Sequence, residues 1–81
     1  MTLRVQLFGQ LAQMAGAAAL EVAVAEPATC HALRERLAAI APQLAKHLDR
    51  CRFAVNHEFA PETQQITEHD EVALIGLVCG G

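Results

Sequence analysis

The chain has 81 residues, of which 53% are hydrophobic and 19% are charged, and its formal net charge is −3. This length fits a single domain, and the composition excludes a disordered chain, which would contain fewer apolar side chains. The six Lys and Arg residues are scattered along the sequence, which argues against a nucleic-acid-binding protein. No apolar run is long enough to span a bilayer, so no membrane association is expected.

The first third of the sequence predicts two strands and a short helix. Residues 2–8 alternate between apolar and polar side chains, as a half-buried strand does. Residues 9–16 are bounded by glycines and predict a short helix that ends at Gly16, where glycine can adopt the left-handed conformation. Residues 20–24 alternate again. The connection is short, so this second strand is expected to be an antiparallel neighbour of the first.

The main helix is predicted over residues 30–41, with Thr29 as its N-cap. One apolar stripe is expected to face the core and to continue beyond Pro42, which breaks or restarts the helix. The stripe comprises Leu33, Leu37, Ile40, Leu44 and Leu48. Arg34 and Arg36 lie off this stripe, and we interpret both as solvated charges.

The last third of the sequence predicts two more strands. Residues 52–56 form the third strand, and residues 56–58 form the turn after it. Residues 61–69 are polar and predicted to be irregular, whereas residues 70–75 form the last strand. Before this strand Glu68, Asp70 and Glu71 form an acidic cluster, interpreted as a solvated turn, although it could also contact an arginine of a partner.

The order strand, strand, main helix, strand, strand indicates an α+β domain. It fits the β-grasp (ubiquitin-like) fold, a mixed sheet of four to five strands packed by one main helix plus a short helix. The first and last strands would then be paired at its centre. We expect one domain over residues 1–81, with residues 77–81 as an extended C-terminal tail.

Cysteine and histidine are arranged in no pattern typical of a metal site or a disulfide framework. Cys30, Cys51 and Cys79 are widely spaced and form no CxxC pair. Cys30 and Cys51 are expected to be semi-buried small side chains, and the four histidines to be solvated. No basic segment followed by an apolar one begins the chain, so a reducing cytoplasm is the expected compartment. No bound cofactor is expected.

The C-terminal pair Gly80-Gly81 is the most informative motif, because it directly follows an apolar strand. Glycines lack Cβ and can pass through a narrow channel close to another backbone. Five extended residues reach about 17 Å, enough to deliver the Gly81 carboxylate into the active site of another protein. If ATP adenylates this carboxylate, a sulfur donor can convert it to a nucleophilic thiocarboxylate. The alternative interpretation is an ordinary flexible chain end.

Four segments together resemble the small subunit of molybdopterin synthase, and the likeness spans essentially the whole chain. They are LFGQLAQMAG near the start, Thr29 with ALRERL, Ala54-Val55-Asn56, and Asp70-Glu71-Val72-Ala73 leading to the diglycine. The resemblance implies a β-grasp fold and adenylation of Gly81 with ATP by a ubiquitin-activating-type adenylyltransferase. It further implies thiocarboxylation and insertion of the tail into the large subunit of molybdopterin synthase. There the sulfur passes to cyclic pyranopterin monophosphate in molybdenum cofactor biosynthesis.

The same resemblance implies roles for individual residues. Gly81 is the sulfur-bearing C-terminus and Gly80 the residue that lies in the channel. The remaining candidates are apolar or small residues of a partner-docking surface. They are Phe8, Phe59, Ile75, Leu77, Val78 and Cys79. Phe8 and Phe59 could equally belong to the core.

The end of the chain departs from the family pattern, because no proline precedes the tail and Cys79 stands where a small hydroxyl residue is usual. A carrier for another pathway, such as thiazole or cysteine biosynthesis, therefore stays open. A ubiquitin-like protein modifier and a plain interaction module stay open as well. No base, nucleophile and oxyanion site can be assembled from the sequence. We thus expect a non-catalytic, sulfur-donating subunit rather than an enzyme by itself.

Overall fold

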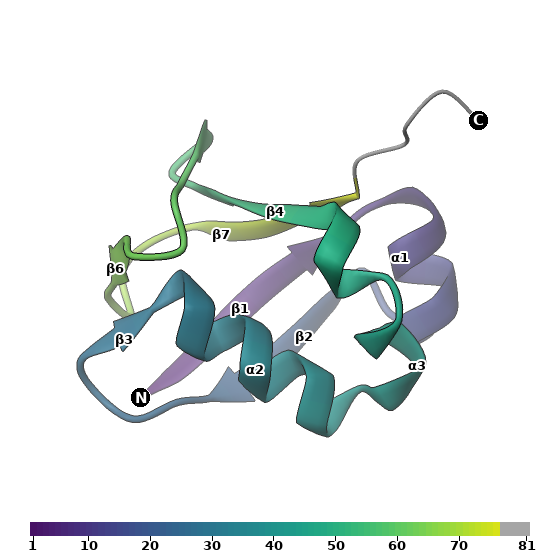
Figure 1. Ribbon diagram of the computed structural model, residues 1–81, viewed down its shortest axis with the longest axis horizontal. Coiled ribbons are helices and arrows are strands. Elements are labelled where there is room, and N and C mark those ends of the chain that lie inside the picture. The colour runs from purple at the N-terminus through teal and green to yellow at the C-terminus, as the bar shows by residue number, and fades with distance from the viewer. Residues whose placement is uncertain (77–81) are drawn as a thin grey trace.

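The computed structural model describes residues 1–76, and the elements form one mixed sheet with helices on one side (Figure 1). The strand order of this sheet is β2-β1-β7-β4-β5. Its strands are β1 (Thr2–Leu7), β2 (Ala19–Ala23), β4 (Cys51–Val55), β5 (Glu58–Phe59) and β7 (Val72–Gly76). Five strands agree with the predicted sheet of four to five, but β5 was not predicted, because Glu58 was expected in the turn after the third strand.

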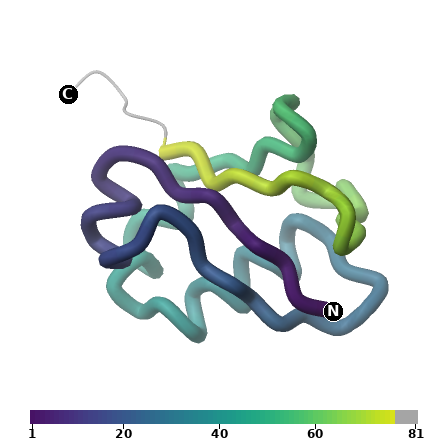
Figure 2. The backbone as a smooth tube through the Cα atoms, turned by 180° about the vertical axis from the view of Figure 1, so that it is seen from behind, coloured from purple at the N-terminus to yellow at the C-terminus, as the bar shows by residue number. Residues whose placement is uncertain are grey.

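The helices are α1 (Gly9–Ala15), α2 (Cys30–Ile40), α3 (Pro42–Ala45) and the 3₁₀-helix η1 (Leu48–Arg50). In Figure 1, α2 crosses in front of the sheet and α3 continues from it. Seen from behind, the strands lie in front and no helix crosses β7 or β4 (Figure 2). The sheet therefore has one helix-covered face and one open face.

The first and last long strands meet at the centre of the sheet, as predicted. β1 pairs with β7 in parallel, with Val5 opposite Val72. β2 and β4 flank this pair, and each is antiparallel to its neighbour. The α+β β-grasp architecture expected from the sequence is thus confirmed.

Local sequence signals set the element boundaries. Gly16 ends α1 in the left-handed conformation, with a φ of 72°, which glycine adopts without a Cβ clash. The Thr29 hydroxyl accepts a hydrogen bond from the backbone N–H of Ala32, 3.2 Å away, and so caps α2. Pro42 is the first residue of α3, a position where its missing N–H costs nothing.

The core lies between the helix-covered face and α2. Alternate residues of β1 and β4 point into it, as the burial pattern of each strand records. The largest fully buried side chains are almost all branched aliphatic residues, in keeping with the scarcity of aromatics. They are Phe53, Leu3, Leu33, Leu37, Leu44, Leu74, Val5, Val22, Val72 and Cys30. Within residues 1–76 no polar or charged residue is fully buried.

One position of the predicted apolar stripe is wrong. Ile40 is 43% exposed, while Leu44 and Leu48 are buried. The helical period does not run through Pro42, because α2 ends at Ile40 and two separate short helices, α3 and η1, follow. Leu44 and Leu48 reach the core from these helices, so Ile40 is not needed on the buried side.

The interpretation of Arg34 as a solvated charge is also wrong, since only 18% of its side chain is exposed. Its guanidinium donates to both carboxylate oxygens of Glu62, at 2.8 and 2.9 Å. It also donates to the backbone carbonyls of Leu48 and Cys51. Arg34 thereby ties α2 to η1, to β4 and to the loop that carries Glu62. A planar fork of donors suits such a junction better than a lysine would.

The segment predicted to be irregular, residues 61–69, contains a short strand. β6 (Gln65–Ile66) pairs antiparallel with β3 (Ala28–Thr29), and together they form a second, two-stranded sheet. Two residues are too few to show a period in the sequence. The buried Ile66 is the one apolar side chain that marks β6.

Cys30 and Cys51 are free thiols, and they are more deeply buried than expected, at 0% and 4% exposure. Burial raises the pKa of both thiols because the thiolate loses hydration. In the part of the chain that the structure describes, no cluster of His, Cys, Asp and Glu could hold a metal ion. No helix in this part is long and apolar enough to cross a membrane.

Candidate docking surface

The open face of the sheet carries apolar side chains, although a sheet face exposed to solvent usually carries polar ones. Strand alternation places Ala73 and Ile75 of β7 on this face, because Val72 and Leu74 point into the core. Ala54 of β4 lies beside Ala73 in the register of the two strands. The side chains of Ala54, Ala73 and Ile75 form an apolar floor on β4 and β7.

Two exposed aromatic rings stand at the sides of this floor. Phe8 follows β1 and is the extended residue before α1, and Phe59 lies in β5 opposite Ala54. Each is 55% exposed. Phe8 and Phe59 were left open as either core or surface residues. The structure shows that both lie on the surface.

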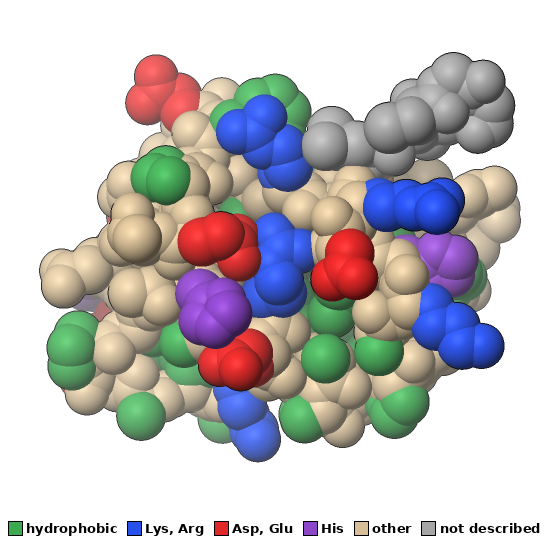
Figure 3. Space-filling view, viewed as in Figure 1, with side chains coloured by type: hydrophobic (Ala, Val, Ile, Leu, Met, Phe, Trp, Pro, Cys, Tyr) green, Lys and Arg blue, Asp and Glu red, His purple; other side chains and the backbone are tan. Residues whose placement is uncertain are grey.

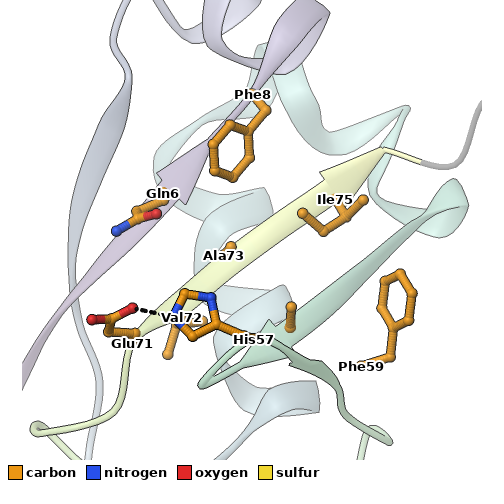
Figure 4. A pocket seen from close by; sticks show the side chains of 9 residues that line it. Gln6, Phe8, His57, Phe59, Glu71, Val72, Ala73 and Ile75 are labelled. Carbon is orange, nitrogen blue, oxygen red and sulfur yellow. Dashed lines mark ion pairs between the residues drawn. The ribbon is translucent and has the colours of Figure 1, made fainter.

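The rings and the floor enclose a hollow of about 350 Å³. We call Phe8, Ala54, Phe59, Ala73 and Ile75 the open-face surface; Figure 4 shows Phe8 and Phe59 on either side of Ile75. Exposed apolar side chains that are contiguous and bordered by polar ones mark sites of protein association. The surface is thus suited to receive apolar side chains of a partner.

Polar groups border the hollow at the beginning of β7. His57 Nε2 lies 3.0 Å from Glu71 Oε2, and both side chains are exposed. They are held by a tight turn in which Asn56 and His57 have φ values of 53° and 72°. The Asn56 side chain donates to Asp70 and accepts from the backbone N–H of Glu71. The turn therefore fixes this polar rim relative to the floor.

Asp70 is an ordered part of this turn. Its carboxylate accepts hydrogen bonds from the backbone N–H of Thr67 at 2.8 Å and from the Asn56 amide at 3.0 Å. These bonds stabilise the charged form and hold the pKa of the Asp70 carboxyl below its usual range. The predicted solvated turn is thus an ordered one.

Arg52 lies at the other end of the floor, outside the hollow itself, and lines a second cavity together with Asp49 and Glu62. It is exposed, its register partner in β7 is Ile75, and its guanidinium carbon lies 4.8 Å from the centre of the Phe59 ring. This distance is typical of a cation–π contact. The positive charge of Arg52 therefore adjoins the apolar surface.

The structure brings together three of the residues predicted for the docking surface, Phe8, Phe59 and Ile75. Leu77, Val78, Cys79, Gly80 and Gly81 lie outside the described residues. Gly76, the last described residue, follows Ile75 directly and ends β7. The open-face surface thus adjoins the point from which the chain continues to the diglycine.

Ala54, Ala73 and His57 were not predicted as site residues, and Glu71 was predicted only as a member of the acidic cluster. Strand parity could have identified Ala73, because Val72 and Leu74 alternate with Ala73 and Ile75 along the predicted strand. Ala54 needed the β4–β7 register. The His57–Glu71 pair needed the geometry of the turn as well.

The sheet order, the single main helix and the open-face surface define a protein of the ubiquitin-like β-grasp class. The chain belongs to the ThiS family, whose sequence pattern matches residues 5–81. Among curated protein sequences, none matches this chain.

Solved structures of similar fold agree with this assignment. Small archaeal modifier protein 1 from Haloferax volcanii is 27% identical, with 100% of each chain covered and a TM-score of 0.84. A proposed molybdopterin converting factor subunit 1 from Pyrococcus furiosus is 20% identical, with 96% of this chain and 99% of that chain covered and a TM-score of 0.84. Both structures share the β-grasp fold with this chain.

A third similar structure contains a second protein. It is the complex of subunits 1 and 2 of molybdopterin-converting factor from Helicobacter pylori. The matching chain is 21% identical, with 100% of each chain covered and a TM-score of 0.68. At least one protein of this fold thus acts with a partner protein.

Proposed function

We propose that the chain is the sulfur-carrying small subunit of molybdopterin synthase, with Gly81 as the carrier residue. The single observation that carries the proposal is the placement of the open-face surface beside Gly76, five residues before the terminal carboxylate. The docking surface thus adjoins the segment that leads to the reactive end of the chain. This arrangement suits a protein that binds two enzymes in turn and presents the same carboxylate to each. The family and the fold support a carrier, and the whole-chain resemblance described above supports the molybdopterin pathway.

The proposed chemistry takes place at the end of the chain and uses active sites of other proteins. In a ubiquitin-activating-type adenylyltransferase, the Gly81 carboxylate attacks the α-phosphate of ATP and releases pyrophosphate. A sulfur donor at the oxidation level of sulfide then displaces AMP and leaves a thiocarboxylate. In the large synthase subunit this sulfur is transferred to cyclic pyranopterin monophosphate, and the Gly81 carboxylate is regenerated when water enters.

The role of this chain's own residues is to bind and to position. Phe8, Phe59 and Ile75 supply apolar area for the interface, as buried anchors do in protein complexes. Gly80 and Gly81 carry no side chains that would obstruct a narrow channel. We propose that the open-face surface contacts both the adenylyltransferase and the large subunit, so that the two compete for it.

Intact-mass measurement tests the carrier function. The chain is co-expressed with the adenylyltransferase and a sulfur source, and its mass is compared with that of the chain expressed alone. We expect a species heavier by the difference between one sulfur and one oxygen atom, and its absence when Gly81 is deleted. An unshifted mass in the presence of active enzyme, ATP and sulfur source would contradict the proposal.

Two other functions remain as alternatives with their own discriminating results. A carrier for thiazole or cysteine biosynthesis would form the same thiocarboxylate but would not release its sulfur to the large synthase subunit. The similarity to small archaeal modifier protein 1 of Haloferax volcanii motivates the second alternative. A modifier would give conjugates of higher mass in cells, joined through Gly81 to lysine side chains of other proteins.

A further inference from the structure

Positive charge is concentrated near the end of β7. The expectation that the six Lys and Arg residues are scattered is wrong for three of them: Lys46, Arg50 and Arg52 fall within one short stretch of the sequence, together with His47. All four are exposed. Figure 3 shows Lys, Arg and His side chains gathered at the side of the molecule where α3 lies. We call Lys46, His47, Arg50 and Arg52 the basic cluster.

The strand register places Arg50 and Arg52 of this cluster beside the end of β7. Lys46 follows α3, Arg50 ends η1 and Arg52 belongs to β4. The residue between the two arginines, Cys51, is the register partner of Gly76. Arg50 and Arg52 therefore flank the position opposite the end of β7, from which the chain continues to Gly81.

The opposite end of β7 has the opposite charge. Glu58, Glu68, Asp70 and Glu71 lie in or near the turns that precede β7, and all but the half-buried Asp70 are exposed. Within the basic cluster Asp49 is the one acidic residue. A chain with a net charge of −3 thus presents a locally positive end next to its functional terminus.

The charges of the cluster are not used for packing within the part of the chain that the structure describes. In residues 1–76, Lys46, Arg50 and Arg52 have no carboxylate within 4.0 Å, whereas Arg34 is paired with Glu62. The Arg52 guanidinium packs against the Phe59 ring, and Arg52 lines a cavity together with Asp49 and Glu62 without forming an ion pair with either. Within residues 1–76 the lysine and arginines of the cluster form no ion pair, so their charges are available to an external anionic surface.

We propose that the basic cluster steers the chain onto acidic residues around the opening of the adenylyltransferase that receives its C-terminus. This inference rests on the proposed function and adds the chemistry of the contact. Arg52 connects the cluster to the open-face surface through Phe59, so one partner can cover both. Complementary charge at an interface acts mainly on the association rate and on orientation.

The test compares two charge reversals of equal size. Lys46→Glu/Arg50→Glu reverses two charges of the cluster and leaves Arg52 and the open-face surface unaltered. Arg4→Glu/Arg36→Glu makes the same change in net charge on β1 and α2, and serves as the matched control. Association with the purified adenylyltransferase is measured by stopped-flow at several salt concentrations, and the melting temperature of each variant confirms folding.

We expect the cluster variant to associate about tenfold more slowly than the wild type at low salt, and the difference to vanish at high salt. The control should associate at nearly the wild-type rate. Equal rates and equal salt dependence for the two variants would overturn the inference. So would a cluster variant that loses binding to a DNA oligonucleotide but binds the enzyme normally.

The same samples separate this inference from the proposed function. Intact mass after reaction with ATP and a sulfur source reports the thiocarboxylate independently of the association rate. If the wild-type chain is thiocarboxylated and the two variants associate at equal rates, only the steering role is overturned. A wild-type chain that neither binds nor changes mass overturns both.

Discussion

The two faces of the sheet use the same kinds of side chain in opposite ways. On the helix-covered face, Phe53 is fully buried against α2 and its neighbours. On the open face, Phe59, in the strand next to it, is 55% exposed. Apolar residues on the first face stabilise the fold, whereas those on the second are left for a partner. The comparison teaches that exposure, rather than composition, separates the folding residues from the docking residues here.

The largest effect is expected from truncating the helix-covered face. Phe53→Ala removes a fully buried ring and leaves a cavity that α2 cannot fill. Such substitutions cost about 3–5 kcal/mol, a large part of the stability of so small a domain. Urea denaturation of the variant measures this cost. A loss below about 1 kcal/mol would show that the two faces do not differ as described.

The next effect is expected at Arg34, which joins elements around the helix-covered face. Arg34→Ala removes the hydrogen bonds to Glu62, Leu48 and Cys51. We expect a loss of about 2 kcal/mol, because bonds with a charged partner are among the stronger ones. Arg36→Ala is the matched control, since Arg36 donates one bond, to the carbonyl of Ala23. Equal losses for both variants would contradict the junction role of Arg34.

A smaller loss of folding stability is expected when the pH is lowered. The Arg34 guanidinium lowers the pKa of Glu62 in the folded chain below its ordinary value of 4.5. A lowered folded pKa gives stability that is present above the unfolded pKa and is lost as the pH falls through the folded value. Denaturation at pH 7 and below pH 4.5 should therefore show a decline that is weaker in Glu62→Gln. An identical decline in wild type and variant would remove Glu62 as a cause.

The smallest effect on stability is expected on the open face. Phe8→Ala and Phe59→Ala should cost about 1 kcal/mol or less, because both rings are half exposed and Phe59 loses one cation–π contact. Binding to the adenylyltransferase should nevertheless weaken about tenfold or more, as expected of an aromatic anchor. Denaturation measures the effect on folding stability, and titration calorimetry measures the effect on affinity for the adenylyltransferase. Unchanged affinity would show that the partner does not use this surface.

The sequence was sufficient for the elements whose signals are local. The alternation of residues 2–8, the cap at Thr29 and the left-handed Gly16 were all predicted, and the structure confirms them. Each of these features depends on residues that are close in sequence, so it can be predicted without knowledge of distant contacts. The central β1–β7 pairing was reached through the order of elements rather than through any local signal.

Features that depend on distant contacts could not be predicted. Arg34 looks like a solvated helix residue until Glu62, 28 positions later, is placed beside it. β6 forms only because β3 offers it a partner. For the candidate site, Phe8, Phe59 and Ile75 were predicted through a resemblance, while Ala54 became visible only with the β4–β7 register. Whether a ring is buried or exposed is decided by the sheet face and not by the residue type.

Single-turnover sulfur release tests the central claim most directly. Thiocarboxylated wild type and thiocarboxylated Phe59→Ala are each mixed with the large subunit of molybdopterin synthase and cyclic pyranopterin monophosphate, and intact mass follows the return of the Gly81 carboxylate. We expect rapid release from the wild type and release slowed about tenfold or more in the variant at subsaturating large subunit. A thiocarboxylate that persists in the wild type would contradict the assignment to molybdopterin synthesis. Equal release from both chains would contradict delivery through the open-face surface.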